Sequence, residues 1–272
     1  MDKPSTLEEY FEWAKANLSV DFTDTTLENL YKANLNNAVN AISESEFYNG
    51  IDAKLAEWSE EYYRDTKSQL LMDTSGLTLL KKPYSSAVDK SFRHNVLWNR
   101  RFPDEPRRGW ITPDNFFSTL NDAIRSMLVC KFIDAPNFLI SKLKSYADER
   151  RLPHRSYSQE RDEGYYAFHF YAKFKIELLN KEWKQQEKDV DFEIQLTTQL
   201  QDILKNLTYP LYRQTRIMPE DDKAKWKWEY GTNRFRAGYL SHTLHLLEAI
   251  IVELREDKVS DSDESAAEGA EI

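Results

Sequence analysis

Cysteine and glycine are scarce in this 272-residue sequence, and their scarcity excludes several kinds of site. The single cysteine, Cys130, cannot form an internal disulfide or a Cys-x-x-Cys zinc site, and its apolar neighbours predict a small buried side chain. The seven glycines are too scattered for a Gly-x-Gly-x-x-Gly loop or a Walker loop. If the protein binds phosphates, lysine and arginine side chains must therefore make most of the contacts to them.

Long apolar runs are also missing. No segment approaches the ~20 apolar residues of a transmembrane helix, and the first residues include acids where a signal peptide needs basic and then apolar regions. With 40% hydrophobic and 13% aromatic residues, the chain can nevertheless build a core. We therefore expect a cytoplasmic protein with no membrane partner.

The net charge of −9 hides a basic middle segment. Residues 80–163 have 16 basic and 11 acidic side chains, whereas residues 257–272 have 1 basic and 6 acidic ones. The middle segment is the place to look for an anionic ligand, with a solvated basic face as the alternative. The acidic end predicts a disordered tail.

Hydrophobic periodicity predicts an N-terminal helical extension over residues 1–75, a second unit over 76–256 and the tail from 257. In the extension, a helix over about 45–72 places five large side chains on one stripe. They are Phe47, Ile51, Leu55, Trp58 and Tyr62. This stripe is expected to face the core.

The second unit alternates helical and strand patterns. A strand over 124–132 lies between helices over 113–123 and 134–149, and a polar loop follows. Period-two alternation over 164–178 predicts another strand, which pairs with a strand over 190–196 as a hairpin. The pattern predicts an α/β fold in which helices wrap a small mixed sheet.

The final helix has an apolar seam with spacings of three and four residues, formed by Leu240, Leu244, Leu247, Ile251 and Leu254. The seam spans only two heptads, too few to establish a coiled-coil dimer. We expect it to pack on the protein's own core, and the oligomeric state stays open.

Two motifs in the predicted hairpin provide the strongest functional signal. Gly164, Tyr165 and His169 open its first strand, and Glu193 and Gln195 end its second. These residues resemble the G-Y-R-S-x-H and E-x-Q-I-R-T motifs of the RelA/SpoT family of alarmone synthetases. The resemblance implies a nucleotidyltransferase-like sheet.

Two upstream segments resemble the same family. Lys82, Ser86 and Lys90 match its K-x-x-x-S-x-x-x-K nucleotide segment, and Arg125 stands at the arginine of D-x-x-G-x-R. The order agrees over about residues 80–215. By spacing, the two lysines and the serine share one helix face that can hold a triphosphate, although a solvated helix face has the same spacing.

The resemblance implies a pyrophosphokinase that transfers the β,γ-pyrophosphate of ATP to the 3′-hydroxyl of a guanosine nucleotide, with Mg²⁺ as cofactor. It implies that Lys82, Ser86, Lys90 and Arg125 bind ATP and that Tyr165 and His169 bind the acceptor. Glu193 and Gln195 would be catalytic, and Glu193 would help to hold Mg²⁺. From the residues alone, Tyr165 could equally be a core aromatic and Glu193 a strand acid facing water.

Several family positions differ in this sequence. Leu120 replaces the metal-binding aspartate, so Asp122 is the candidate metal ligand in its place. Leu80, Tyr166 and Thr197 replace arginines, which removes two-pronged phosphate clamps. Two alternatives therefore stay open: a toxin that pyrophosphorylates the 3′ end of tRNA and has an antitoxin partner, and a degenerate domain that binds nucleotides or a partner without catalysis.

Overall fold

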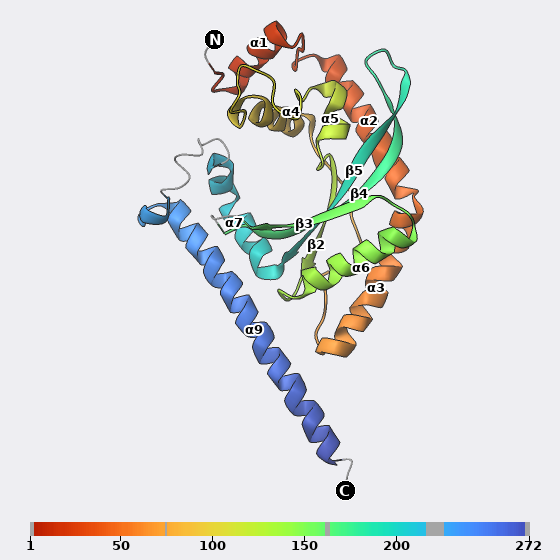
Figure 1. Cartoon of the computed structure of the whole chain (residues 1–272), viewed down its shortest axis with the longest axis vertical. Helices are drawn as coiled ribbons and strands as arrows, with labels where there is room; N and C mark the ends of the chain where they lie inside the picture. Colours follow the sequence, from red (N-terminus) through yellow and green to blue (C-terminus); the bar gives the residue numbers. More distant parts are fainter. Residues whose placement is uncertain (1–2, 74, 161–163, 216–225, 270–272) are drawn as a thin grey trace.

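The computed structural model describes residues 3–73, 75–160, 164–215 and 226–269, which form helices and one five-stranded sheet (Figure 1). The N-terminal helices are α1 (Leu7–Asn17), α2 (Thr25–Ser43) and α3 (Glu46–Thr66). The strands are β1 (Leu80–Lys81), β2 (Ile124–Cys130), β3 (His154–Glu160), β4 (Tyr166–Leu179) and β5 (Gln185–Thr198). Further α-helices are α4 (Tyr84–Phe92), α5 (Phe116–Thr119), α6 (Ala135–Glu149), α7 (Gln199–Thr215) and α9 (Asn233–Gly269). None of the described helices has the length and apolarity to cross a membrane.

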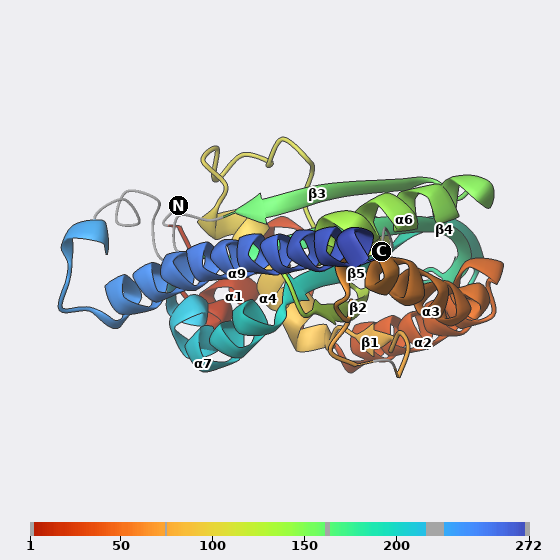
Figure 2. The same ribbon diagram turned by 90° about the horizontal axis from the view of Figure 1, so that it is seen from below.

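The sheet is mixed, as the sequence predicts. Its strand order is β1-β2-β5-β4-β3, with β3 along one edge (Figure 2). Strands β2 and β5 run parallel, whereas the other neighbouring pairs are antiparallel. The predicted hairpin is confirmed as β4 and β5, which pair from Phe168 with Leu196 to Leu179 with Gln185. The α/β fold with a small mixed sheet is therefore confirmed.

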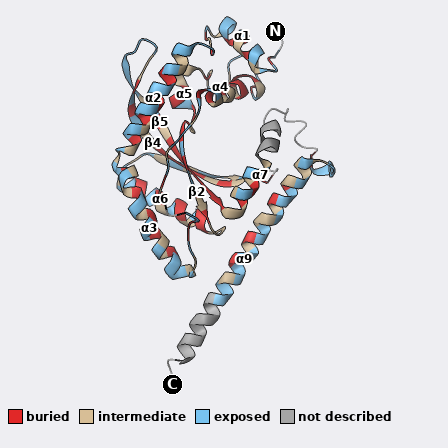
Figure 3. Ribbon diagram, turned by 180° about the vertical axis from the view of Figure 1, so that it is seen from behind, coloured by how far each residue is buried: buried red, intermediate tan, exposed pale blue. Residues whose placement is uncertain are grey.

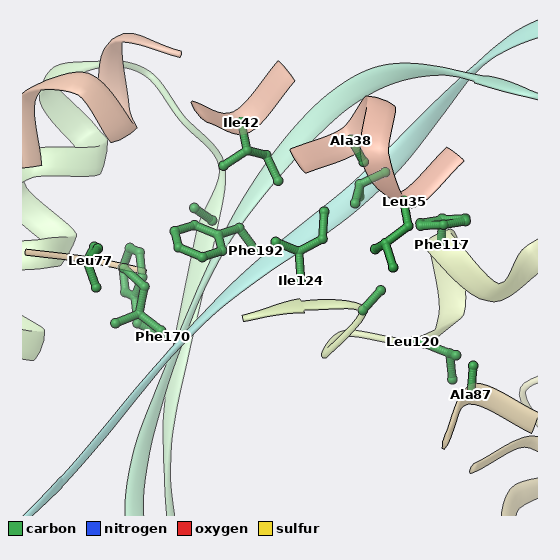
Figure 4. Close-up of a cluster of buried hydrophobic side chains, with 14 of the residues drawn as sticks. Leu35, Ala38, Ile42, Leu77, Ala87, Phe117, Leu120, Ile124, Phe170 and Phe192 are labelled. Carbon is green, nitrogen blue, oxygen red and sulfur yellow. The ribbon is translucent and has the colours of Figure 1, made fainter. Parts of the chain in front are cut away.

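One face of the sheet is apolar and packs against helices. Ile124, Phe170 and Phe192 point to this face from three different strands and are fully buried. Figure 4 shows side chains of α2 over this surface, namely Leu35, Ala38 and Ile42. Because side chains alternate along a strand, the residues between these apolar positions project from the opposite face.

The N-terminal helices form for identifiable local reasons. In α1, the Thr6 hydroxyl and the Glu9 carboxylate make a reciprocal capping box. In α3, all five members of the predicted stripe are buried. This helix ends at Thr66, earlier than predicted, because Lys67 takes a left-handed conformation and its N–H bonds to the Tyr63 carbonyl.

Two segments differ from the sequence prediction. Residues 154–160, predicted as part of a loop, form β3 and pair with β4. Residues 257–269, predicted as a disordered tail, continue helix α9. That segment has no proline and no glycine before Gly269, so nothing interrupts the helical backbone. The boundaries at residues 75 and 256 stay predictions.

The apolar seam of α9 is exposed. Leu240, Leu247 and Leu254 are 49%, 44% and 58% accessible. The expectation that this seam packs on the protein's own core is therefore wrong. The helix contacts the rest of the chain through another side, where the Ser241 hydroxyl bonds to Gln201 at 3.0 Å and Arg255 bonds to Asp134 at 2.8 Å.

Candidate active site

Glu193 is a buried carboxylate on the polar face of the sheet. Alternation along β5 turns Phe192 and Ile194 into the helix-covered core and leaves Glu193 on the other face. Its Oε1 atom accepts hydrogen bonds from Nδ1 of His169 at 2.6 Å and from the Tyr171 hydroxyl at 2.8 Å. These two bonds offset the cost of burying a carboxylate.

Tyr165 and Gln195 extend the same face. The Gln195 side-chain amide donates a hydrogen bond to the Tyr165 hydroxyl. The rings of Tyr165 and His169 lie 6.5 Å apart, so these two predicted acceptor-binding residues lie on one side of β4. Tyr165 is half-buried and leaves part of its ring open to a ligand.

Arg125 brings a positive charge to this face from β2. The parallel register pairs Arg125 with Glu193, so both side chains project from the same side of the sheet. Unlike Glu193, Arg125 is exposed. It can therefore meet an anionic group that approaches from solvent.

Lys82 and Lys90 converge on Asp122 in the turn before β2. The Nζ atoms lie 2.9 Å and 2.8 Å from the two carboxylate oxygens, and Lys90 also bonds to Oδ1 of Asn121 at 3.0 Å. Burial alone would raise the pKa of Asp122, but the two ammonium groups outweigh it and hold that pKa below its usual range. Burial lowers the pKa of Lys82, and Asp122 offsets part of that effect.

Lys82 reaches this site from the end of β1, which corrects the prediction that it lies on a helix. Helix α4 starts after Pro83, and the Lys82 N–H instead donates to the Ala123 carbonyl at 2.9 Å. Of the predicted triplet, only Ser86 and Lys90 lie on α4, one turn apart.

The register also decides which face Lys82 occupies. Its neighbour Lys81 points to the helix-covered side, where it bonds to Asn36 of α2. By alternation, Lys82 projects from the opposite side, together with Arg125 and Glu193. The charge of Arg125 contributes to the lowered pKa of Lys82, as expected for neighbouring cations.

Comparisons with known proteins bear on the fold. No family model matches the chain, and no curated protein matches it. A solved structure of a GTP pyrophosphokinase family protein from Streptococcus pneumoniae covers 84% of this chain and 93% of its own, with a TM-score of 0.52 and 17% identity. The chain has the fold of that family protein. The RelA/SpoT resemblance is confirmed at the level of the fold. A structure of small alarmone synthetase 1 from Bacillus subtilis bound to its product pppGpp covers 77% of this chain and 91% of its own, with a TM-score of 0.48 and 17% identity.

Strand β3 adds two residues to this face of the sheet, Arg155 and Tyr157, and the sequence analysis missed Tyr157. The Tyr157 hydroxyl lies 3.0 Å from the Tyr171 hydroxyl, and its ring stacks on His169 at 5.1 Å. The Arg155 guanidinium lies 4.4 Å from the centre of the Tyr171 ring. Burial and the nearby charge of Glu193 raise the pKa of Tyr171, so its hydroxyl stays a proton donor.

The described residues do not fit a resident metal site. Among them, no three histidine, cysteine or acidic side chains gather in a metal-binding arrangement. Both oxygens of Asp122 contact lysine amines, and Glu193 is bonded to His169 and Tyr171. The predicted Mg²⁺ ligands, Asp122 and Glu193, therefore have other partners in this structure.

Proposed function

We propose that the protein is an ATP-dependent pyrophosphokinase that transfers the β,γ-pyrophosphate of ATP to the 3′-hydroxyl of a guanosine nucleotide, which is alarmone synthesis. One observation supports this most strongly: Glu193, Arg125 and Lys82 project from one face of the sheet, opposite the helix-packed face. A base and cations on one face suit a transfer between a hydroxyl and a polyphosphate. The fold shared with a GTP pyrophosphokinase family protein supports the same reaction class.

Glu193 takes the proton of the acceptor hydroxyl in this proposal. His169 and Tyr171 both bond to its Oε1 atom, and no other described residue bonds to Oε2. The Oε2 atom is therefore the acceptor for the 3′-hydroxyl proton. The oxygen then attacks the β-phosphorus, the bond from that phosphorus to the α–β bridging oxygen breaks, and AMP leaves.

Lys82, Lys90 and Arg125 stabilise the negative charge of the transferred group. In the free protein, Asp122 holds the two lysine amines at the site. Phosphate oxygens compete with this carboxylate for the same ammonium groups, so the amines are already positioned before ATP binds. Ser86 lies one turn before Lys90 and supplies a hydroxyl on the same side of α4.

Tyr165 stacks on the base of the acceptor, and His169 fixes the carboxylate beside it. The arginines expected near the acceptor are absent, and their replacements add no charge there. Tyr166 instead faces α9, where its hydroxyl lies 2.5 Å from Nδ1 of His242 and its ring stacks on His245 at 3.7 Å. Base stacking therefore contributes more to acceptor binding than phosphate contacts in this protein.

Mg²⁺ remains part of the proposal as an ion that arrives with ATP. In many phosphoryl-transfer sites this ion keeps several waters and is held by substrate phosphates with one or two carboxylates. Asp122 and Glu193 are the carboxylates of the site, each with other partners in the free protein, and no step above is routed through the ion.

The test follows the label from γ-labelled ATP into separate incubations with GDP, GTP, AMP and bulk tRNA, with an incubation lacking acceptor as control. We expect label on GDP or GTP, and release of AMP in equal amount. Label on tRNA alone would replace the nucleotide acceptor by the tRNA end, with an antitoxin as the expected partner. Thermal stabilisation by nucleotides without any product would indicate a binding domain and contradict the proposal.

A further inference from the structure

Tyr165 directly precedes strand β4, at the level where β5 ends and α7 begins. The pairing of β4 with β5 starts at Phe168, three residues after Tyr165. Residues 164–166 instead line a small cavity together with side chains of α7 and α9, among them Gln201 and Ser241. The position of Tyr165 therefore depends on these two helices as well as on the sheet.

Gly164 makes a close contact with α9. Its φ is +86°, a left-handed conformation that glycine adopts without strain. The Ser241 hydroxyl donates a hydrogen bond to the Gly164 carbonyl, and a Cβ atom at position 164 would lie 2.9 Å from the carbonyl oxygen of Gly238. The backbone before Tyr165 is therefore in direct contact with α9, and no side chain fits between them.

Tyr166 attaches the other side of Tyr165 to the same helix. Its hydroxyl lies 2.5 Å from Nδ1 of His242, and its ring stacks on His245 with an angle of 7° between the ring planes. The hydrogen bond and the stacked ring together fix the position of this side chain. Because neighbouring residues of a strand point to opposite faces, Tyr165 is then directed to the polar face, where it meets Gln195.

The buried surface of α9 is small, and part of it serves this contact. Figure 3 shows exposed and intermediate positions along most of the described part of α9. Among the described residues of this helix, the buried ones are Gly238, Ser241, Glu248 and Val252. The first two lie against Gly164, so the acceptor side of the site is one of the places where α9 is attached to the rest of the chain.

We propose that residues 238–245 of α9 complete the acceptor site by holding Tyr165 in the orientation that stacks on the acceptor base. Ser241, His242 and Tyr166 are positioning residues in this arrangement, because they act through Tyr165 and do not touch the acceptor. The inference rests on the proposed function, which assigns Tyr165 to the acceptor. The related motif has an arginine at position 166, so the chain gains a fixed stacking ring where it loses a phosphate contact.

Acceptor kinetics in the labelled-ATP assay test the positioning role. With GDP or GTP as acceptor, Ser241→Ala and Tyr166→Ala should each raise the KM for the acceptor at least about fivefold and leave the KM for ATP within about twofold, because each variant loses a hydrogen bond that holds the start of β4. Tyr166→Phe keeps the stacked ring on His245 and should lie between the parent and Tyr166→Ala.

The matched control is Arg255→Gln, which removes bonds from α9 to Asp134 and to the Tyr62 hydroxyl. Arg255 lies 14 residues, or roughly 21 Å, farther along the helix than Ser241. This variant loosens α9 away from the acceptor side and should change neither KM. An increase of the acceptor KM in Arg255→Gln equal to that in Ser241→Ala would overturn the local role of residues 238–245.

Adding Ser241→Ala to Tyr165→Ala separates positioning from a general loss of structure. If Ser241 acts through Tyr165, the double variant has the same acceptor KM as Tyr165→Ala alone. A further fivefold increase in the double variant, or equal changes of both KM values in Ser241→Ala, would contradict the inference.

Amide hydrogen exchange of residues 164–170 in the full chain gives a readout that needs no turnover. Exchange in this segment should be at least about fivefold faster in Ser241→Ala and Tyr166→Ala, and Arg255→Gln should match the parent. Unchanged exchange in the first two variants would refute the role of α9. If the parent transfers no label to GDP or GTP, the proposed function fails, and exchange alone then decides whether α9 holds Tyr165.

Discussion

Replacing Asp122 by asparagine tests the charge cluster at the candidate active site. The substitution keeps the size of the side chain and removes the negative charge between Lys82 and Lys90. These two side chains are only 12% and 17% exposed, so their ammonium groups lose their counter-charge where water cannot fully replace it. Removing one partner of a fully buried ion pair costs about 3–5 kcal/mol.

We expect a smaller loss, about 2–4 kcal/mol, because the side chains keep some exposure and Lys90 keeps its bond to Asn121. Urea unfolding at pH 7, monitored by circular dichroism, gives the free energy of unfolding. The control is Asp114→Asn, which breaks an ion pair to Lys181 whose side chains are 52% and 44% exposed. That control should cost less than about 1 kcal/mol.

The pH dependence supplies an independent check. The folded state holds the pKa of Asp122 below that of the unfolded chain, so its stabilising contribution is present above about pH 4. That contribution is lost as the pH falls further, and the difference between Asp122→Asn and the parent should shrink from about pH 4 downwards. Equal losses in Asp122→Asn and Asp114→Asn at pH 7, or a difference that does not change with pH, would refute the reasoning.

Two further predictions concern the acceptor side of the site. Tyr165→Ala should raise the KM for the acceptor about tenfold and leave the KM for ATP within about twofold, because stacking on a base is worth ~1–3 kcal/mol. Equal changes in both KM values would contradict the stacking role of Tyr165. Tyr171→Phe removes a hydrogen bond to Glu193, so kcat should fall about tenfold. Tyr157→Phe, which leaves that bond in place, should change kcat less, and a larger effect there would place the important hydroxyl on β3.

Hydrophobic periodicity predicted the helices and strands that bury one face and expose the other. Helix α3 shows its stripe in the sequence because it packs against other elements along its length. The hairpin strands β4 and β5 alternate because one face meets helices and the other forms the site. Strand β3 is an edge strand that pairs only with β4, and none of its side chains is fully buried. Its sequence therefore has no apolar alternation to detect.

For the candidate site, the sequence predicted which side chains share a face better than which side chains bond to each other. Alternation along the strands predicted that Glu193 and Gln195 share one face of the sheet and that Tyr165 and His169 share one face, and the structure confirms both placements. The ion pairs of Asp122 join residues 40 and 32 positions away, and no local pattern reports such contacts. The spacing that suggested a helix for Lys82 overlooked Pro83, which disfavours helical backbone in the preceding residue.

The apolar seam of α9 shows a different limit of prediction from sequence. Its spacing predicts correctly that these side chains lie along one line of a helix. It does not identify the surface that covers them, because an intramolecular core and a second chain demand the same pattern. The exposure of Leu240, Leu247 and Leu254 shows that the protein's own core does not cover them.

The most direct test of the account is the turnover of Glu193→Gln in the labelled-ATP assay, compared with Asp191→Asn. Asp191 lies two residues earlier on β5 and pairs with Arg155, so it controls for losing a strand carboxylate beside the site. The account predicts that Glu193→Gln loses at least about 1,000-fold in kcat while binding ATP as the parent does, because the carboxylate accepts the hydroxyl proton. Transfer by Glu193→Gln at a rate comparable to Asp191→Asn would contradict it.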